Sequence, residues 1–562
     1  MIPYSGALTG VPGASPRTVG LALFLALFGT LAVACGGGTD GNFATGGDPT
    51  SVPLPTLTPT LATGLPEPSS TPTLVSVLDP LSDLDPGSEQ APEADSSFSE
   101  SPEPTPTFDP GDVILPTVVA ATPEPTDLLD ADLQARLDDI EPAVSALREL
   151  YAVDDTQRRF ITRAELEVRL VDDLEDGREE FDEYGRLYEI MGITEPGTDL
   201  YELFLDLYST GVLGFFDPEL NELYVVDDDS SELSPQDHLT YTHEFVHVLQ
   251  QQHFDIGGVM DSDELMHNSD RAAAYRALIE GDATLLETIY MFQNMTAEEQ
   301  ASAQDLGVDL SSFFAAPHMV QRTFLFPYLE GAQFVLQVFA ETGWKGVNAL
   351  YERAPESTEQ IMHPAKYRSG EAPLEVDIPA FEDVLGQGWS ELHRDTFGEF
   401  ALAAYLEDRL PQNQAAVATA GWGGDRYALY VGPGDTSLLV HRLTWDTVGD
   451  AAEFFGAFAG FSEARFGTEW DLLDGEGSAI QMVLPDRVVY AVIRGTTTDL
   501  VFAPSVDVLD LVVDALSPTS GVLEAESSTS TEPYGQARRG GQEPQGFTGS
   551  GLGLRLFIMR VL

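Results

Sequence analysis

The chain has a single cysteine and few basic residues. Of its 562 residues, 27 are Lys or Arg and 93 are Asp or Glu, which gives a formal net charge of −66. Phosphate contacts need Lys and Arg, so this balance argues against a nucleic-acid ligand and against electrostatic docking on anionic lipid. With Cys35 alone, an internal disulfide and a cysteine-rich zinc site are excluded, so any bound metal must use His, Asp or Glu.

Long hydrophobic segments are also scarce. The apolar run at residues 19–34 is short for a membrane span, which needs roughly 20 residues, but it suits the apolar region of a secretion signal. It ends in Leu-Ala-Val-Ala-Cys and resembles a bacterial lipoprotein cleavage site, although Ala32 stands where leucine is more usual. We therefore expect residues 1–35 to be a signal peptide, with Cys35 lipidated and the protein exported to the outer face of the bacterial cell membrane. An ordinary signal with an incidental cysteine is the alternative.

Composition divides the rest of the chain. Residues 36–126 are rich in Pro, Thr, Ser, Gly and acidic residues without apolar periodicity, which predicts a disordered, extended linker. Helical periodicity begins near residue 127, and strand-like runs alternate with helices after residue 381. We expect one folded domain at 127–380, a smaller α+β domain at 381–516 and a disordered tail at 517–562.

A His-Glu-x-x-His motif, His243-Glu244-Phe245-Val246-His247, is the strongest functional signal. Residues four apart lie on one face of a helix, so His243 and His247 can bind one metal ion while Glu244 takes a proton from water. The flanking residues are apolar, which indicates a buried helix, and buried polar groups need partners. The motif predicts a zinc site; a pair of hydrogen-bonded core histidines is the alternative.

The β-type runs at 212–226 predict a hairpin, which in zinc peptidases offers an edge strand to the substrate.

Two residues compete to be the third zinc ligand. His253 lies six residues after His247, as in the metzincin pattern, but Gln250 replaces the glycine that breaks the helix there. On an unbroken helix six residues turn about 600°, so His253 would point elsewhere. Glu280 lies on the next long predicted helix and would complete a His₂Glu site. We therefore prefer Glu280.

The motif with its Leu-Gln ending and the later Glu-Gly-Asp-Ala, which begins at Glu280, resemble a group of bacterial gluzincin-like proteins. Segments at 357–364 and 421–427 look like parts of the same group, and the resemblance covers residues 127–516. It implies an α+β fold: a mostly helical, zincin-like catalytic domain with a small edge β-hairpin, followed by the smaller α+β domain. Gluzincins often carry an Asp four residues after the ligand glutamate, where it is a hydrogen-bond partner that orients a zinc-binding histidine. This chain has Thr284 at that position, and Asp282 or Glu287 could be the partner instead.

These expectations predict an exported zinc metallopeptidase that hydrolyses peptide bonds with Glu244 as general base. Tyr367, His363 and Tyr328 are candidate donors to the oxyanion of the transition state. The expected partners are a peptide or protein substrate and a membrane reached only through the lipid anchor. The alternatives are a non-catalytic binding lipoprotein that keeps the peptidase fold and a zinc hydrolase of a non-peptide amide.

Overall fold

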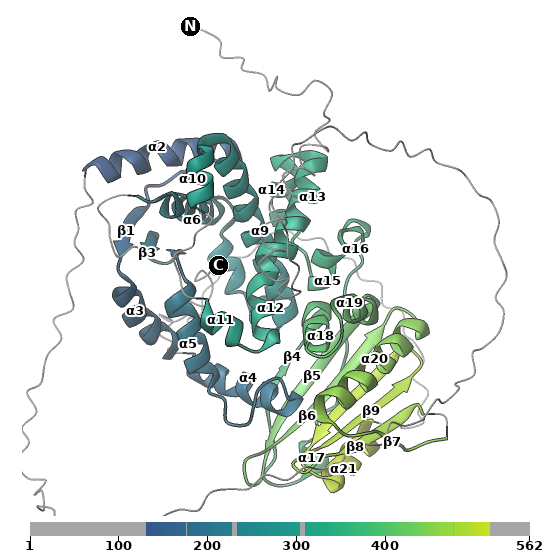
Figure 1. Ribbon diagram of the computed structural model, residues 1–562. Coiled ribbons are helices and arrows are strands. Elements are labelled where there is room, and N and C mark those ends of the chain that lie inside the picture. Colours follow the sequence, from purple (N-terminus) through teal and green to yellow (C-terminus); the bar gives the residue numbers. More distant parts are fainter. Residues whose placement is uncertain (1–130, 176, 227–232, 304–309, 476, 517–562) are drawn as a thin grey trace, which may run out of the picture. The chain divides into compact units, whose positions relative to one another are not determined.

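A computed structural model describes residues 131–516 except 176, 227–232, 304–309 and 476 (Figure 1). All described residues belong to one compact unit. The predicted signal peptide, Cys35, the linker and the tail also lie outside the described residues. Within these residues, no helix combines the length and apolar character that crossing a bilayer requires.

The first part of the described chain is mostly helical. The long helices that hold the site are α2 (Ala131–Arg148), α6 (Pro235–Phe254) and α9 (Ser269–Asn294). Helix α6 begins with a capping box, in which Ser234 and Asp237 bond each other's backbone, and Pro235 occupies its first turn. The remaining helices are α3 (Arg163–Glu175), α4 (Arg178–Met191), α5 (Leu200–Gly211), α7 (Ile256–Met260), α8 (Asp263–Met266), α10 (Ala297–Ser302), α11 (Ser311–Ala315), α12 (His318–Phe326), the π-helix η1 (Pro327–Gly331), α13 (Ala332–Thr342), α14 (Trp344–Glu352), α15 (Thr358–Met362), α16 (Pro364–Ser369) and α17 (Glu382–Leu385).

A three-stranded sheet lies beside α6. The expected hairpin is present as β2 (Gly214–Asp217) and β3 (Glu222–Val226), and β1 (Gln157–Ile161) adds in parallel to β3. The strand order β1-β3-β2 leaves β2 at an edge. Sequence patterning did not reveal β1, because its Gln-Arg-Arg-Phe-Ile sequence lacks a buried face.

The later part of the chain forms a seven-stranded antiparallel sheet with order β4-β5-β6-β10-β9-β8-β7. Alternate strand residues face α20 (Val448–Phe466) on one side and α21 (Val506–Leu516) on the other, so both faces are covered (Figure 1). The remaining bounds are β4 (Ser390–Asp395), α18 (Gly398–Glu407), α19 (Gln412–Thr419), β5 (Trp422–Gly432), β6 (Thr436–Trp445), β7 (Asp471–Leu472), β8 (Ala479–Val483), β9 (Val488–Arg494) and β10 (Thr497–Ala503).

The α+β prediction is confirmed, and one hydrophobic core cluster runs through both parts of the chain, from Leu133 to Phe502. Residues 422–427 belong to β5, where Trp422 and Tyr427 are buried. Arg426 donates to the Thr396 hydroxyl.

Candidate metal centre

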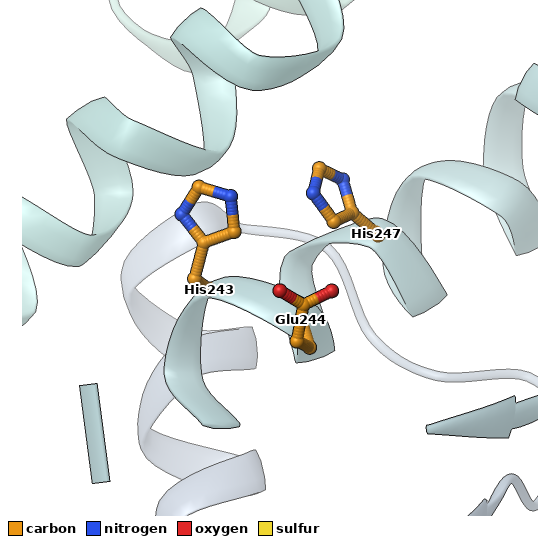
Figure 2. A group of neighbouring side chains, drawn as sticks. All are labelled: His243, Glu244 and His247. Carbon is orange, nitrogen blue, oxygen red and sulfur yellow. The ribbon is translucent and has the colours of Figure 1, made fainter. Parts of the chain in front are cut away.

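Helix α6 presents both histidines of the motif on one face. Figure 2 shows His243 and His247 projecting from the same side of the helix with Glu244 beside them. One possible ligand atom from each of the three residues lies within 4.8 Å of those of the other two. All three side chains are buried, with at most 2% of their surface exposed. This group could hold a metal ion.

Helix α9 brings Glu280 to the same point. Its Oε2 lies 3.1 Å from His243 Nε2 and 3.5 Å from His247 Nε2. Ligand atoms bound to one tetrahedral ion at the usual zinc distances lie about 3.3–3.5 Å apart, so the three atoms have the spacing of a shared coordination shell. Without a metal, the same contacts are hydrogen bonds. Glu280 could therefore supply a third ligand to a metal ion held by the two histidines.

The outer nitrogen of each imidazole has its own partner. His243 Nδ1 lies 3.0 Å from Glu287 Oε2, and His247 Nδ1 lies 2.8 Å from Gln250 Oε1. Partners of this kind orient metal-binding histidines and turn the other nitrogen inward. Glu287, seven residues and two turns after Glu280, thus occupies the role left open by Thr284. The sequence analysis considered Gln250 only as a replacement for a glycine and did not identify it as a partner of His247. Its three-residue spacing from His247, which makes the two residues neighbours on a helix, could have indicated this contact.

The protonation of this group reflects its concentration of carboxylates. Burial lowers the pKa of His243, but hydrogen bonds to Glu280 and Glu287 outweigh it and raise that pKa to about 9. For His247 burial also lowers the pKa, yet the charge of Glu280 leaves it raised. Burial raises the pKa of Glu280, while the two histidines bring it down to about 2. The metal-free group therefore holds protons, which a bound cation would displace.

The edge strand β2 passes directly over Glu244. A Cβ atom placed on Gly214 would lie 3.2 Å from Cγ of Glu244 and 2.6 Å from Cγ2 of Thr240. The second distance is too short for any side chain, so glycine is required where the strand meets the helix. The backbone of an edge strand thus lies beside the motif's carboxylate.

The π-helix η1 meets α9 next to Glu280. A Cβ on Gly281 would lie 2.4 Å from the Gly331 carbonyl carbon, and one on Gly331 would lie 2.2 Å from the Ala277 oxygen. The two glycines allow backbone contact between η1 and α9. This packing places the ring centroid of Tyr328 6.2 Å from the ring centroid of His243. Isolated π-helical turns are common at functional sites.

Three other candidate residues have partners elsewhere. His253 is exposed near the end of the unbroken α6, and its Nε2 lies 2.8 Å from the Tyr151 carbonyl oxygen. The Tyr367 hydroxyl donates to the Arg353 carbonyl at 2.7 Å. His363 Nε2 lies 2.8 Å from Oε1 of the buried Glu399. The structure thus brings Glu280 to the histidines of the motif and gives His253, Tyr367 and His363 different surroundings.

A second group of carboxylates has a cation of its own. The possible ligand atoms of Glu359, Glu371 and Asp446 lie within 4.8 Å of one another. Lys366 Nζ lies among them, at 2.5 Å from Glu359, 3.0 Å from Glu371 and 2.7 Å from Asp446. Sequence reasoning did not find this group, because Asp446 is 80 residues away from the lysine.

Comparison with known proteins gives a family match in the later part of the chain. A family model described as a domain of unknown function (DUF8575) matches residues 385–513, which exclude the motif and Glu280. No curated protein matches the chain. A crystal structure from Chloroflexus aurantiacus, provisionally described as that of a hydrolase with a novel fold, is 18% identical and has a TM-score of 0.31; the match covers 44% of this chain and 92% of that one. A likeness this small carries no inference about fold or activity.

Proposed function

We propose that the protein is an exported, zinc-dependent metallopeptidase of the gluzincin type, with His243, His247 and Glu280 as ligands. The observation that carries the proposal is the position of Glu280 Oε2, 3.1 and 3.5 Å from the two Nε2 atoms. Three protein ligands leave one coordination position open, which is the pattern of catalytic zinc. Histidine and glutamate are suitable zinc ligands, and the outer partners at Glu287 and Gln250 support the same assignment.

The chain's own residues would carry the proton transfers. Zinc, when bound, makes water more acidic and polarises a carbonyl group. Glu244, buried beside the histidines, accepts a proton from the attacking water and passes it to the leaving nitrogen. Among the candidate oxyanion donors, Tyr328 is the one whose ring lies beside His243. Tyr367 and His363 bond other groups and are weaker candidates.

The edge strand supports a peptide substrate over another amide. An extended peptide that added to β2, which lies at the edge of its sheet, would be aligned by main-chain hydrogen bonds. Because Gly214 lies against Glu244, a peptide on this edge would pass close to the general base. Retention of Glu244 favours catalysis over a binding module, which has no need of that carboxylate.

Export is part of the same proposal and rests on sequence alone. Residues 1–35 would direct secretion, and Cys35 would carry the lipid. The linker at 36–126 would then hold the folded part away from the membrane.

The test is Glu244→Gln, compared with wild type and with Glu341→Gln, a control at an exposed glutamate. We expect Glu244→Gln to keep its zinc and to cleave a mixed peptide library about 10²–10⁴-fold more slowly, because only the proton acceptor is lost. The control should cleave at the wild-type rate. Wild-type cleavage by Glu244→Gln would contradict the mechanism, and zinc-loaded wild type that cleaves no peptide would support a binding module.

A further inference from the structure

We propose that Arg148, Asp282 and Gln250 are positioning residues for His247, acting as one buried hydrogen-bond chain that begins on α2. The inference rests on the proposed metal centre, but none of the three residues is a ligand or belongs to the proposed reaction. All three are buried: Arg148, Asp282 and Gln250 are each 0% exposed. Side chains of this polarity are costly to bury, so their arrangement calls for an explanation.

The chain fixes which nitrogen of His247 carries the proton. The Gln250 amide nitrogen donates to the Ile279 carbonyl at 3.0 Å and to Asp282 Oδ2 at 3.1 Å. Both of these partners only accept, so the amide nitrogen must face them and Oε1 must face His247. Oε1 lies 2.8 Å from His247 Nδ1 and can only accept, so Nδ1 is the donor. When a bound metal replaces the proton on Nε2, the neutral ring keeps its proton on Nδ1 and presents the lone pair of Nε2 toward the side where Glu280 lies, as metal binding requires.

Asp282 is held in turn by Arg148. Arg148 Nε lies 2.8 Å from Oδ1 and Nη2 lies 2.9 Å from Oδ2, a two-pronged pair that fixes the plane of the carboxylate. Tyr351 donates to Oδ2 at 2.8 Å. The guanidinium also donates to Asn348 at 2.8 Å and lies 4.5 Å from the centroid of Trp344. Asp282 is therefore kept as an acceptor in one orientation, which is what the Gln250 amide requires.

The two histidines are thus oriented by different means. His243 bonds the carboxylate of Glu287 directly, and that side chain is 16% exposed. His247 bonds the neutral amide of Gln250, and that amide in turn bonds the fully buried ion pair of Asp282 and Arg148. Helix α2 therefore contributes to the metal centre without supplying a ligand.

The test compares Gln250→Met with Gln252→Met, a control on the same helix whose amide bonds the backbone of Val153 and Asp154 instead. For each folded variant we would measure zinc affinity, the visible spectrum of the Co²⁺-loaded protein and the thermal unfolding of the metal-free protein. We expect Gln250→Met to bind zinc about 10–100-fold more weakly and to change the Co²⁺ spectrum, as is usual when an outer partner is removed. The control should match wild type in zinc affinity and in the Co²⁺ spectrum.

A second variant keeps the inference testable if Gln250→Met does not fold. Arg148→Met with Asp282→Leu removes both buried charges together, which proteins tolerate far better than removing one. Gln250 then loses one of its two anchors, and we expect zinc affinity to fall about 10-fold. Wild-type affinity and spectrum in either folded variant would overturn the inference, as would a lower unfolding temperature with unchanged zinc affinity. If wild type itself binds no zinc, the proposed function fails instead.

Discussion

Two groups of side chains within the described residues have the composition of a metal site, and they differ in what neutralises them. In the group on α6 and α9, two imidazoles and Glu280 converge, with Glu244 alongside. In the group formed by Glu359, Glu371 and Asp446, the ammonium of Lys366 already lies within 3.0 Å of all three carboxylates. The second group carries its own cation, whereas the first has ligand atoms but no Lys or Arg among them.

The two groups also differ in how firmly their surroundings hold and bury the side chains. Behind the histidines stand Glu287 and Gln250, which hold both rings with Nε2 toward Glu280. The Lys366 group is more open, since Glu371 and Asp446 are 42% and 37% exposed. Proximity of carboxylates is therefore a weak sign of a metal site; ligand atoms that are oriented from behind and have no Lys or Arg among them are a stronger one.

The largest effect should come from removing a ligand of the first group. His243→Ala takes away one of three proposed ligands, and we expect zinc affinity to fall about a thousandfold or more. Isothermal titration with a competing chelator measures the change. His267→Ala, an exposed histidine bonded to the Asp263 carbonyl, is the matched control. Equal zinc affinity in both variants would remove the distinction between the two groups.

Zinc affinity should also depend on pH. In the metal-free protein the pKa of His243 is raised to about 9, so below that pH the ring holds a proton that zinc must displace. Affinity should therefore rise with pH, by about tenfold per unit for one displaced proton, and level off near pH 9. Titrations at pH 6, 7 and 8 measure the slope. A flat profile would show that the cluster does not exchange protons for metal.

A smaller loss is expected for Glu287→Ala. This change leaves all three proposed ligands but frees the outer nitrogen of His243, and we expect zinc to bind about 10–100-fold more weakly. Glu298→Ala, at an exposed glutamate in the first turn of α10, should leave the affinity unchanged. If Glu287→Ala binds like this control, orientation from behind is not what distinguishes the first group.

The smallest effect on zinc binding should come from the second group. Lys366→Met removes the shared cation from three carboxylates, and we expect about 1–3 kcal/mol of lost stability in chemical denaturation, discounted for their exposure. Zinc stoichiometry should not change, because the lysine is not part of the histidine group. Added Ca²⁺, which prefers oxygen ligands, should recover part of the loss. A loss of zinc in this variant would mean that the two groups are not independent.

Much of the first group could be predicted from the sequence because helical spacing fixes it. The four-residue spacing places His243 and His247 together, and replacement of a glycine by Gln250 indicated that His253 would point away from them. For the outer partner of one zinc-binding histidine the sequence left Asp282 and Glu287 open, and the structure pairs Glu287 directly with His243. Asp282 acts one step further out, through Gln250.

What could not be predicted depends on contacts between distant segments. Arg148 meets Asp282 across 134 residues, and Lys366 meets Asp446 across 80. No local pattern encodes such pairs. The same holds for β1, whose pairing with β3 is parallel and distant in sequence, and for the contact of Gly214 with Glu244.

The most direct test of the account is elemental analysis of purified wild type beside Glu280→Ala and His253→Ala. We predict about one zinc per chain in wild type and in His253→Ala, and a marked loss of zinc in Glu280→Ala. The reason is that the Glu280 carboxylate lies beside the Nε2 atoms of both histidines, whereas His253 bonds the Tyr151 carbonyl. A folded wild type without zinc would contradict the account. So would zinc retained by Glu280→Ala and lost by His253→Ala.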